Sequence, residues 1–207
     1  MFSITLTIII ITCLVSIAAF GNYKIKEDLL FWPAAMKGRQ LYRFVTHGFV
    51  HGDYLHLAFN MYSFWSFGES IEGWFTAVFQ EKGRILYILF YVLAIVFASL
   101  PEYFKQRDNY AYRSLGASGA VCAVIFALIL LNPMMKLSPL FLPIGIPGFI
   151  MGPLFLIISV YLAKRGRDNI GHSAHITGAL FGLVYIIVVA RLVANIDVVQ
   201  YFLSKFR

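Results

Sequence analysis

Long apolar runs alternate with short polar segments along the whole chain. A helix needs about 20 residues to cross the roughly 30 Å hydrocarbon core of a bilayer, and several of the runs approach that length. Six runs can be marked, at residues 3–20, 54–78, 85–100, 118–131, 149–163 and 174–194. The pattern predicts an all-α fold, a polytopic membrane protein built as a bundle of six transmembrane helices.

The segments between the runs are short, with one exception. Residues 21–53 mix charged side chains with large apolar ones, a composition typical of a loop that lies in the membrane interface. Asn132 and Pro133 follow the fourth run and end it, because proline cannot continue a helix. No lysine or arginine precedes the first run, so we expect a retained helix and not a signal peptide.

The composition agrees with this assignment. Apolar residues make up 60% of the 207 residues and charged residues only 13%, a balance far from that of soluble globular domains. Six helices with short connections use nearly all of the chain. We therefore expect a single domain over residues 1–207.

The formal net charge is +7, but the basic residues lie in short loops beside apolar runs. That placement is typical of membrane orientation and of contacts with anionic lipid head groups, so we expect membrane lipids as partners and no nucleic acid. Eleven of the seventeen lysines and arginines fall in the first, third and fifth connections. By the positive-inside rule alone, that face of the protein is cytoplasmic.

A candidate catalytic residue lies where a polar loop meets the start of the fourth apolar run. Residues 116–119 read Gly-Ala-Ser-Gly, and small neighbours let a substrate backbone approach a serine closely. Ser118 is therefore a candidate nucleophile. Serine is also a common cap at a helix start, and the short motif alone does not decide between the two roles.

Counting the crossings brings further polar residues to the depth of Ser118. Alternate loops lie on the same side of a membrane, so the second, fourth and sixth runs begin at one face. His56 and Asn60 are four residues apart on the second helix and face the same way, and His175 opens the sixth run. Because polar side chains within a span usually face the bundle interior or a cavity, the pattern predicts a buried polar site made of these four residues.

Small residues predict close packing between the fourth and sixth helices. Gly178 and Gly182 follow His175 at helical spacing, and glycines stand on either side of Ser118. Close packing would bring His175 within hydrogen-bond reach of Ser118, as a general base requires.

Acyl transfer also needs hydrogen-bond donors aimed at the oxyanion that develops in the transition state. The backbone N–H of Ser118 stands at a helix start, where the helix dipole assists it. The side chains of His56 and Asn60 are the other candidate donors.

These residues together resemble the rhomboid family of intramembrane serine proteases in its basic six-helix form, over nearly the whole chain. The residues that carry the resemblance are Tyr42-Arg43, His51, His56, Asn60, Gly116-x-Ser118-Gly119 and Ala174-His175 with Gly178 and Gly182. Each string is common, but all of them in this order are highly specific. Two positions depart from the family pattern: Tyr42 stands where tryptophan is usual, and Cys122 where a tyrosine often packs against the catalytic histidine.

The resemblance implies a site without metal or cofactor that cleaves transmembrane protein substrates near or within their membrane segment, after a small side chain. Its catalytic pair would be Ser118 and His175, and its oxyanion site the Ser118 backbone with His56 and Asn60. It also implies structural support from Arg43, His51, Gly116, Gly119, Gly178 and Gly182. Substrates of the family enter from the lipid, here past the helix at 149–163 and the loop at 164–173. The family's usual arrangement, with a cytoplasmic amino terminus and an outward-facing site in the cell membrane, is the orientation we expect.

Several residues allow another interpretation. His172 is a rival base, although we expect it in a loop. His47 and His51 are spaced as metal ligands on one helical face, but no acid or cysteine nearby completes a set. Glu72 is expected to tie the first loop to the bundle. Cys122, like Cys13, lies inside an apolar run, which argues against a disulfide framework.

Two alternative functions remain beside proteolysis. A non-catalytic relative could use the same fold to bind membrane proteins or to act in their quality control. A small transporter is a third possibility, but the polar layer lies near one surface and no pair of interrupted helices repeats between the halves of the chain.

Overall fold

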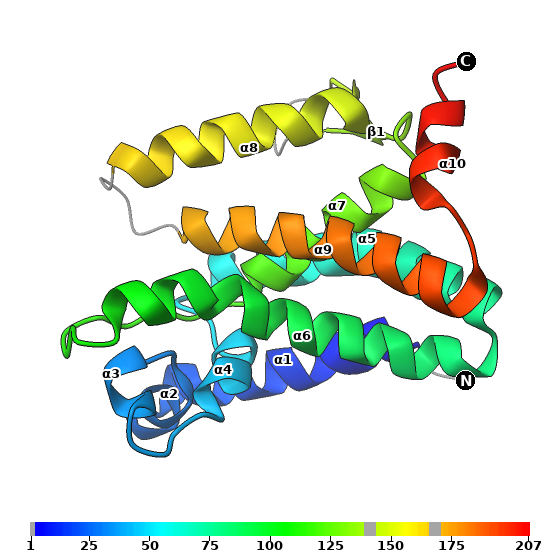
Figure 1. Ribbon diagram of the computed structural model, residues 1–207. Helices are drawn as coiled ribbons and strands as arrows, with labels where there is room; N and C mark the ends of the chain where they lie inside the picture. The colour runs from blue at the N-terminus through cyan, green and yellow to red at the C-terminus, as the bar shows by residue number, and fades with distance from the viewer. Residues whose placement is uncertain (1–2, 139–143, 166–170) are drawn as a thin grey trace.

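The computed structural model describes residues 3–138, 144–165 and 171–207, and they form a bundle built almost entirely of helices (Figure 1). Helices occupy all six ranges marked from the apolar pattern. The long helices are α1 (Ile4–Gly21), α5 (Tyr54–Phe79), α6 (Glu81–Gln106), α7 (Ser118–Leu131), α8 (Gly148–Arg165) and α9 (His172–Ala194).

Membrane-spanning character differs among these helices. Within the described ranges, four helices are long and apolar enough to cross a bilayer, namely α1, α6, α8 and α9. Helix α7 is apolar but has only 14 residues, and α5 has 26 residues but carries polar residues on its buried side. The chain is a multi-pass integral membrane protein.

Short elements complete the chain. The first loop contains α2 (Tyr23–Leu29), α3 (Pro33–Met36), α4 (Arg43–Thr46) and the 3-10 turn η1 (His47–Phe49). The two-residue strands β1 (Lys136–Leu137) and β2 (Ile146–Pro147) form an antiparallel ribbon before α8, and α10 (Val198–Ser204) follows α9. The apolar pattern indicates none of these elements, because each is shorter than the window in which periodicity is visible.

His172 is not a loop residue, contrary to the sequence-based prediction. It is the first residue of α9, where the N–H of His175 donates to the carbonyl of Gly171 at 3.1 Å. That bond closes a helical turn around His172, and the side chain is buried. Residues 166–170 of the predicted entry loop at 164–173 lie outside the described residues.

Helix α7 is the centre of the bundle. Most of its residues are buried, and it contacts α5, α6, α8 and α9. Helix α8 lies along one edge of the bundle and is coloured yellow in Figure 1. It buries only Gly148, Gly152 and Ser159. Helix α7 is therefore packed closely by its other neighbours and only loosely by α8.

The closest approach in the bundle joins α7 to α9. A Cβ atom built on Gly178 would lie 2.0 Å from the carbonyl oxygen of Gly119, and one built on Gly182 would lie 2.2 Å from that of Ala123. Real Cβ atoms do not approach a carbonyl oxygen so closely, so the two backbones touch only because both positions are glycine.

Glu72 holds α1 and not the first loop, contrary to the prediction from the sequence. Its carboxylate accepts hydrogen bonds from the backbone N–H groups of Ile4 and Thr5 at 2.7 and 2.8 Å, and from the Thr5 hydroxyl at 2.8 Å. The first N–H groups of a helix have no partner within the helix, and a negative charge is favourable there. Glu72 therefore anchors the start of α1 to the last third of α5.

The glycine contact predicts a stability difference between two substitutions. Gly178→Ala should force α7 and α9 apart and lower the free energy of unfolding by about 1–3 kcal/mol. Gly73→Ala is the matched control, because a Cβ at that helical glycine of α5 meets nothing within 4 Å. It should be neutral or stabilise by up to about 1 kcal/mol. Reversible unfolding in detergent micelles measures both, and equal values for the two variants would contradict the packing account.

Candidate active site

The turn before α7 presents Ser118 at the helix start. Gly116 has a φ of +113°, a conformation that other residues rarely adopt. A Cβ atom at Gly116 would also lie 2.8 Å from the Cε1 atom of His56. Glycine is thus required at this position for both its conformation and its size. The backbone just before Ser118 lies close to the ring of His56.

His175 lies directly beside Ser118. Its Nε2 atom is 2.8 Å from the Ser118 hydroxyl oxygen, and both side chains are partly buried. The two residues stand near the starts of α7 and α9, whose backbones meet at Gly119, directly after Ser118, and at Gly178, three residues after His175. The distance suits transfer of the hydroxyl proton to the imidazole.

Two rings lie near the imidazole of His175. The ring of Phe155 from α8 lies 6.1 Å away and that of His172 lies 6.0 Å away, edge-on. Cys122 sits instead in a small apolar cluster with Phe126 and Ala179. The ring beside His175 therefore comes from Phe155 of α8. Cys122, which stands where the family often has a tyrosine, does not supply it. Nothing in the sequence singles out Phe155 from the other apolar residues of its helix.

His56 and Asn60 border the same space as Ser118 and His175. All four line a cavity of about 1350 Å³. The N–H of Gly52 donates to Nδ1 of His56 at 3.4 Å, so a neutral His56 carries its own hydrogen on Nε2, beside the turn. The Asn60 amide donates to the His56 carbonyl at 3.0 Å. These contacts orient two polar side chains that line the same cavity as Ser118.

The first loop holds the two residues that precede the serine. The N–H of Gly116 donates to the carbonyl of His47 at 2.9 Å, and the N–H of Ala117 donates to Nε2 of His51 at 3.4 Å. Burial lowers the pKa of His47 to about 4 and that of His51, which also lies near His56, to about 3. Both rings are therefore neutral near pH 7, and His51 can offer a lone pair to Ala117.

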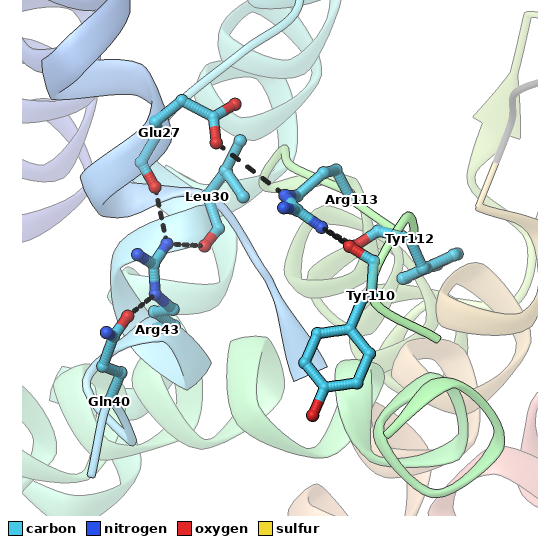
Figure 2. A network of polar contacts seen from close by, with 7 residues as sticks. All are labelled: Glu27, Leu30, Gln40, Arg43, Tyr110, Tyr112 and Arg113. Atoms are coloured by element: carbon cyan, nitrogen blue, oxygen red, sulfur yellow. Dashed lines mark hydrogen bonds and ion pairs between the residues drawn. The ribbon is translucent and has the colours of Figure 1, made fainter. Parts of the chain in front are cut away.

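Arg43 fastens the first loop to itself. Its buried guanidinium donates to the carbonyls of Glu27 and Leu30, both at 2.7 Å, and to the Gln40 side chain at 2.6 Å. Figure 2 shows these bonds converging on one side chain. The guanidinium also lies 5.5 Å from the centre of the Tyr42 ring, so the tyrosine supplies the aromatic neighbour expected of tryptophan in the resembling family.

A second arginine, Arg113, joins the first loop to the segment that leads to Ser118. It lies 3.7 Å above the ring of Trp32 and 3.8 Å from the carboxylate of Glu27, the ion pair drawn in Figure 2. Beside it, the backbones of Phe31 and Ser114 exchange hydrogen bonds of 2.9 and 3.1 Å. The loop and the serine-bearing turn are thus linked by an ion pair, a ring contact and two backbone bonds.

The histidines of the first loop use their ring nitrogens in hydrogen bonds within the protein. His47 donates from Nδ1 to the Arg43 carbonyl at 2.8 Å, and His51 uses both of its nitrogens in hydrogen bonds. Among the residues that the structure describes, no three His, Cys, Asp or Glu side chains gather as ligands of a metal ion would.

The structure brings most of the predicted site residues to one cavity and leaves a few outside it. Its lining includes Ser118, His175, His56, Asn60, Gly116 and Gly119. Gly178 and Gly182 lie at the helix contact below the cavity, and Arg43 and His51 lie in the loop packed behind the turn. The lining also includes four charged residues that the sequence did not single out for the site, namely Glu102, Lys105, Arg113 and Lys164.

Comparison with known proteins gives a consistent set of relatives. A sequence model of the Rhomboid domain matches residues 38–192. The presenilin-associated rhomboid-like protein, mitochondrial, of Homo sapiens is 34% identical over 142 residues, which are 67% of this chain and 35% of that protein. Rhomboid protease GlpG of Photorhabdus laumondii is 27% identical over 183 residues, 87% of this chain and 59% of that protein. RHOMBOID-like protein 12, mitochondrial, of Arabidopsis thaliana is 29% identical over 151 residues, 69% of this chain and 45% of that protein. The chain thus spans about a third of the presenilin-associated relatives.

The contacts of Arg43 predict that it stabilises the protein. Arg43→Ala leaves the carbonyls of Glu27 and Leu30 without their charged donor and should lower the free energy of unfolding by about 2–4 kcal/mol. Arg43→Lys should restore only part of the loss, because an ammonium group cannot reach several acceptors in the fixed geometry of a guanidinium. Arg39→Ala is the control, since Arg39 is exposed in the same loop, and it should change stability by less than about 0.5 kcal/mol. Thermal unfolding in detergent distinguishes these outcomes, and a neutral Arg43→Ala would contradict the role.

Proposed function

The chain belongs to the rhomboid family, and we propose that it is an intramembrane serine endopeptidase that cleaves transmembrane protein substrates near or within their membrane segment. The observation that carries the proposal is the 2.8 Å separation between Nε2 of His175 and the Ser118 hydroxyl. A nucleophile and a base at hydrogen-bond distance, both lining a cavity between apolar helices, are what hydrolysis of a peptide bond in a membrane needs.

In the proposed reaction, the Ser118 oxygen attacks the scissile carbonyl while its proton passes to Nε2 of His175. The negative charge then develops on the carbonyl oxygen, where the Ser118 N–H, His56 and Asn60 would donate hydrogen bonds. Collapse of the tetrahedral intermediate breaks the C–N bond, and His175 returns the proton to the leaving amine. Water then hydrolyses the acyl-enzyme by the same steps, with no third acid, metal or cofactor.

We further propose that all six long helices cross the membrane. Helix α7 has only 14 residues, which suits a span that begins below the surface, at the bottom of a cavity open to water. Polar residues on α5 suit a helix that lines this cavity. Substrates would enter from the lipid past α8, the helix with the fewest buried residues among the long ones, and lipid head groups would contact the basic loops.

The orientation we propose has a cytoplasmic amino terminus and a site that opens to the outer side of the cell membrane. The excess of basic residues in the first, third and fifth connections favours the opposite orientation. Several relatives carry the word mitochondrial in their names, which makes a mitochondrial membrane the alternative location.

The alternative function is a rhomboid-like protein that binds membrane proteins without cutting them. Such a protein has no need of a base beside Ser118, and substitution at either residue would leave its binding intact. Proteolysis is favoured because the base, the nucleophile and two candidate oxyanion donors line one cavity.

The proposed pair predicts the loss of cleavage by two substitutions. Purified protein in detergent should cleave a model transmembrane substrate. Ser118→Ala and His175→Ala should each lower kcat at least about 10⁴-fold, since the residues of such a pair act as a unit. Ser66→Ala is the control, because this exposed serine on α5 donates to the carbonyl of Tyr62 in its own helix. Undiminished cleavage by either variant of the pair would refute the assignment.

The proposed oxyanion donors predict a milder loss that falls on the chemical step. His56→Ala or Asn60→Ala should lower kcat by about 10²-fold with little change in KM, because these bonds strengthen only as the oxyanion forms. Steady-state kinetics on the same substrate measure both constants. A variant that raises KM and leaves kcat unchanged would assign the residue to substrate binding instead.

A further inference from the structure

Ser16 is a buried polar residue outside the cavity, on the side of α1 that faces the first loop. The side chain is fully buried, as is that of His51. The Ser16 hydroxyl lies 2.9 Å from the carbonyl of Phe49 and 3.0 Å from Nδ1 of His51. Ser16 is therefore in contact with a histidine that bonds to the turn before Ser118.

A single arrangement of hydrogens satisfies all the bonds around His51. The N–H of Ala117 is a donor, so Nε2 of His51 must present a lone pair. A neutral imidazole with a lone pair on Nε2 carries its hydrogen on Nδ1. That hydrogen can only be donated to the Ser16 oxygen, whose own hydrogen goes to the Phe49 carbonyl. Ser16 is thus the acceptor that selects the Nδ1–H tautomer.

We propose that Ser16 is a positioning residue for the reaction, which acts by fixing the tautomer and ring orientation of His51 and, through Ala117, the turn that carries Ser118. The inference rests on the proposed function, because the turn matters for the reaction only if Ser118 is the nucleophile. Its geometry stands on three hydrogen bonds: Ser16 to the Phe49 carbonyl, Ser16 to His51, and Ala117 to His51.

Loss of the Ser16 hydroxyl would alter two features of the site. In the other tautomer, the hydrogen on Nε2 of His51 would face the N–H of Ala117, which sets two donors against each other. A rotated ring would also press on His56, because the rings of His51 and His56 lie edge to face with centres 5.0 Å apart. Both changes displace groups that surround Ser118 without removing any group that would touch the substrate.

The kinetic test compares Ser16→Ala with a matched neighbour. Ser16→Ala should lower kcat by roughly 10- to 100-fold with KM unchanged, since small misplacements of a reacting group cost that much. Ser16→Thr keeps the hydroxyl and should retain most of the activity. Thr12→Val is the control: Thr12 lies one turn earlier in α1, is equally buried, and within the described part of the chain its hydroxyl has no hydrogen-bond partner. It should cleave like the wild type.

The second test reads the tautomer directly. In protein labelled with ¹⁵N-histidine, the His51 resonances of the wild type should be those of a ring with hydrogen on Nδ1, and Ser16→Ala should change them while Thr12→Val does not. Wild-type kcat in Ser16→Ala, or an equal loss of kcat in Thr12→Val, would overturn the proposal. So would an unchanged His51 tautomer in Ser16→Ala. A wild-type protein that cleaves nothing would refute the proposed function, and the resonances would still decide whether Ser16 sets the tautomer.

Discussion

The backbones of α7 and α9 touch at Gly119 and Gly178, and the geometry of the site depends on that contact. Helices in lipid gain little from burying apolar side chains against each other, so close backbone approach is a main source of their association. Here that approach also sets the distance between the helix starts. Since Ser118 and His175 stand within one turn of the contact, their 2.8 Å separation follows from packing that the glycines permit.

The contact fixes the distance between two helices, but the direction in which the serine points depends on the first loop. Gly116 and Ala117 donate their N–H groups to His47 and His51, and Arg43 holds together the loop that carries both histidines. Glu72 of α5 bonds to the start of α1, and Ser16 near the end of α1 bonds to the first loop. Elements far from the cavity thus contribute to its shape through a short series of hydrogen bonds.

Much of the fold could be predicted from the sequence, because six apolar runs and small residues at helical spacing are local signals. The meeting of Ser118, His175, His56 and Asn60 could be expected from counting crossings, although their chemical roles remain proposals. Other features could not be predicted. The partners of Glu72 and the packing of Phe155 against His175 depend on contacts between distant segments, and the helical position of His172 depends on a single backbone bond at Gly171.

The most direct test of the account is a crystal structure of the protein after reaction with a serine-directed phosphonate, whose tetrahedral phosphorus stands in for the intermediate. The account predicts a covalent bond to the Ser118 oxygen, with the phosphoryl oxygen within hydrogen-bond distance of the Ser118 N–H, His56 and Asn60. An adduct on another residue, or a phosphoryl oxygen that points away from these three donors, would contradict it.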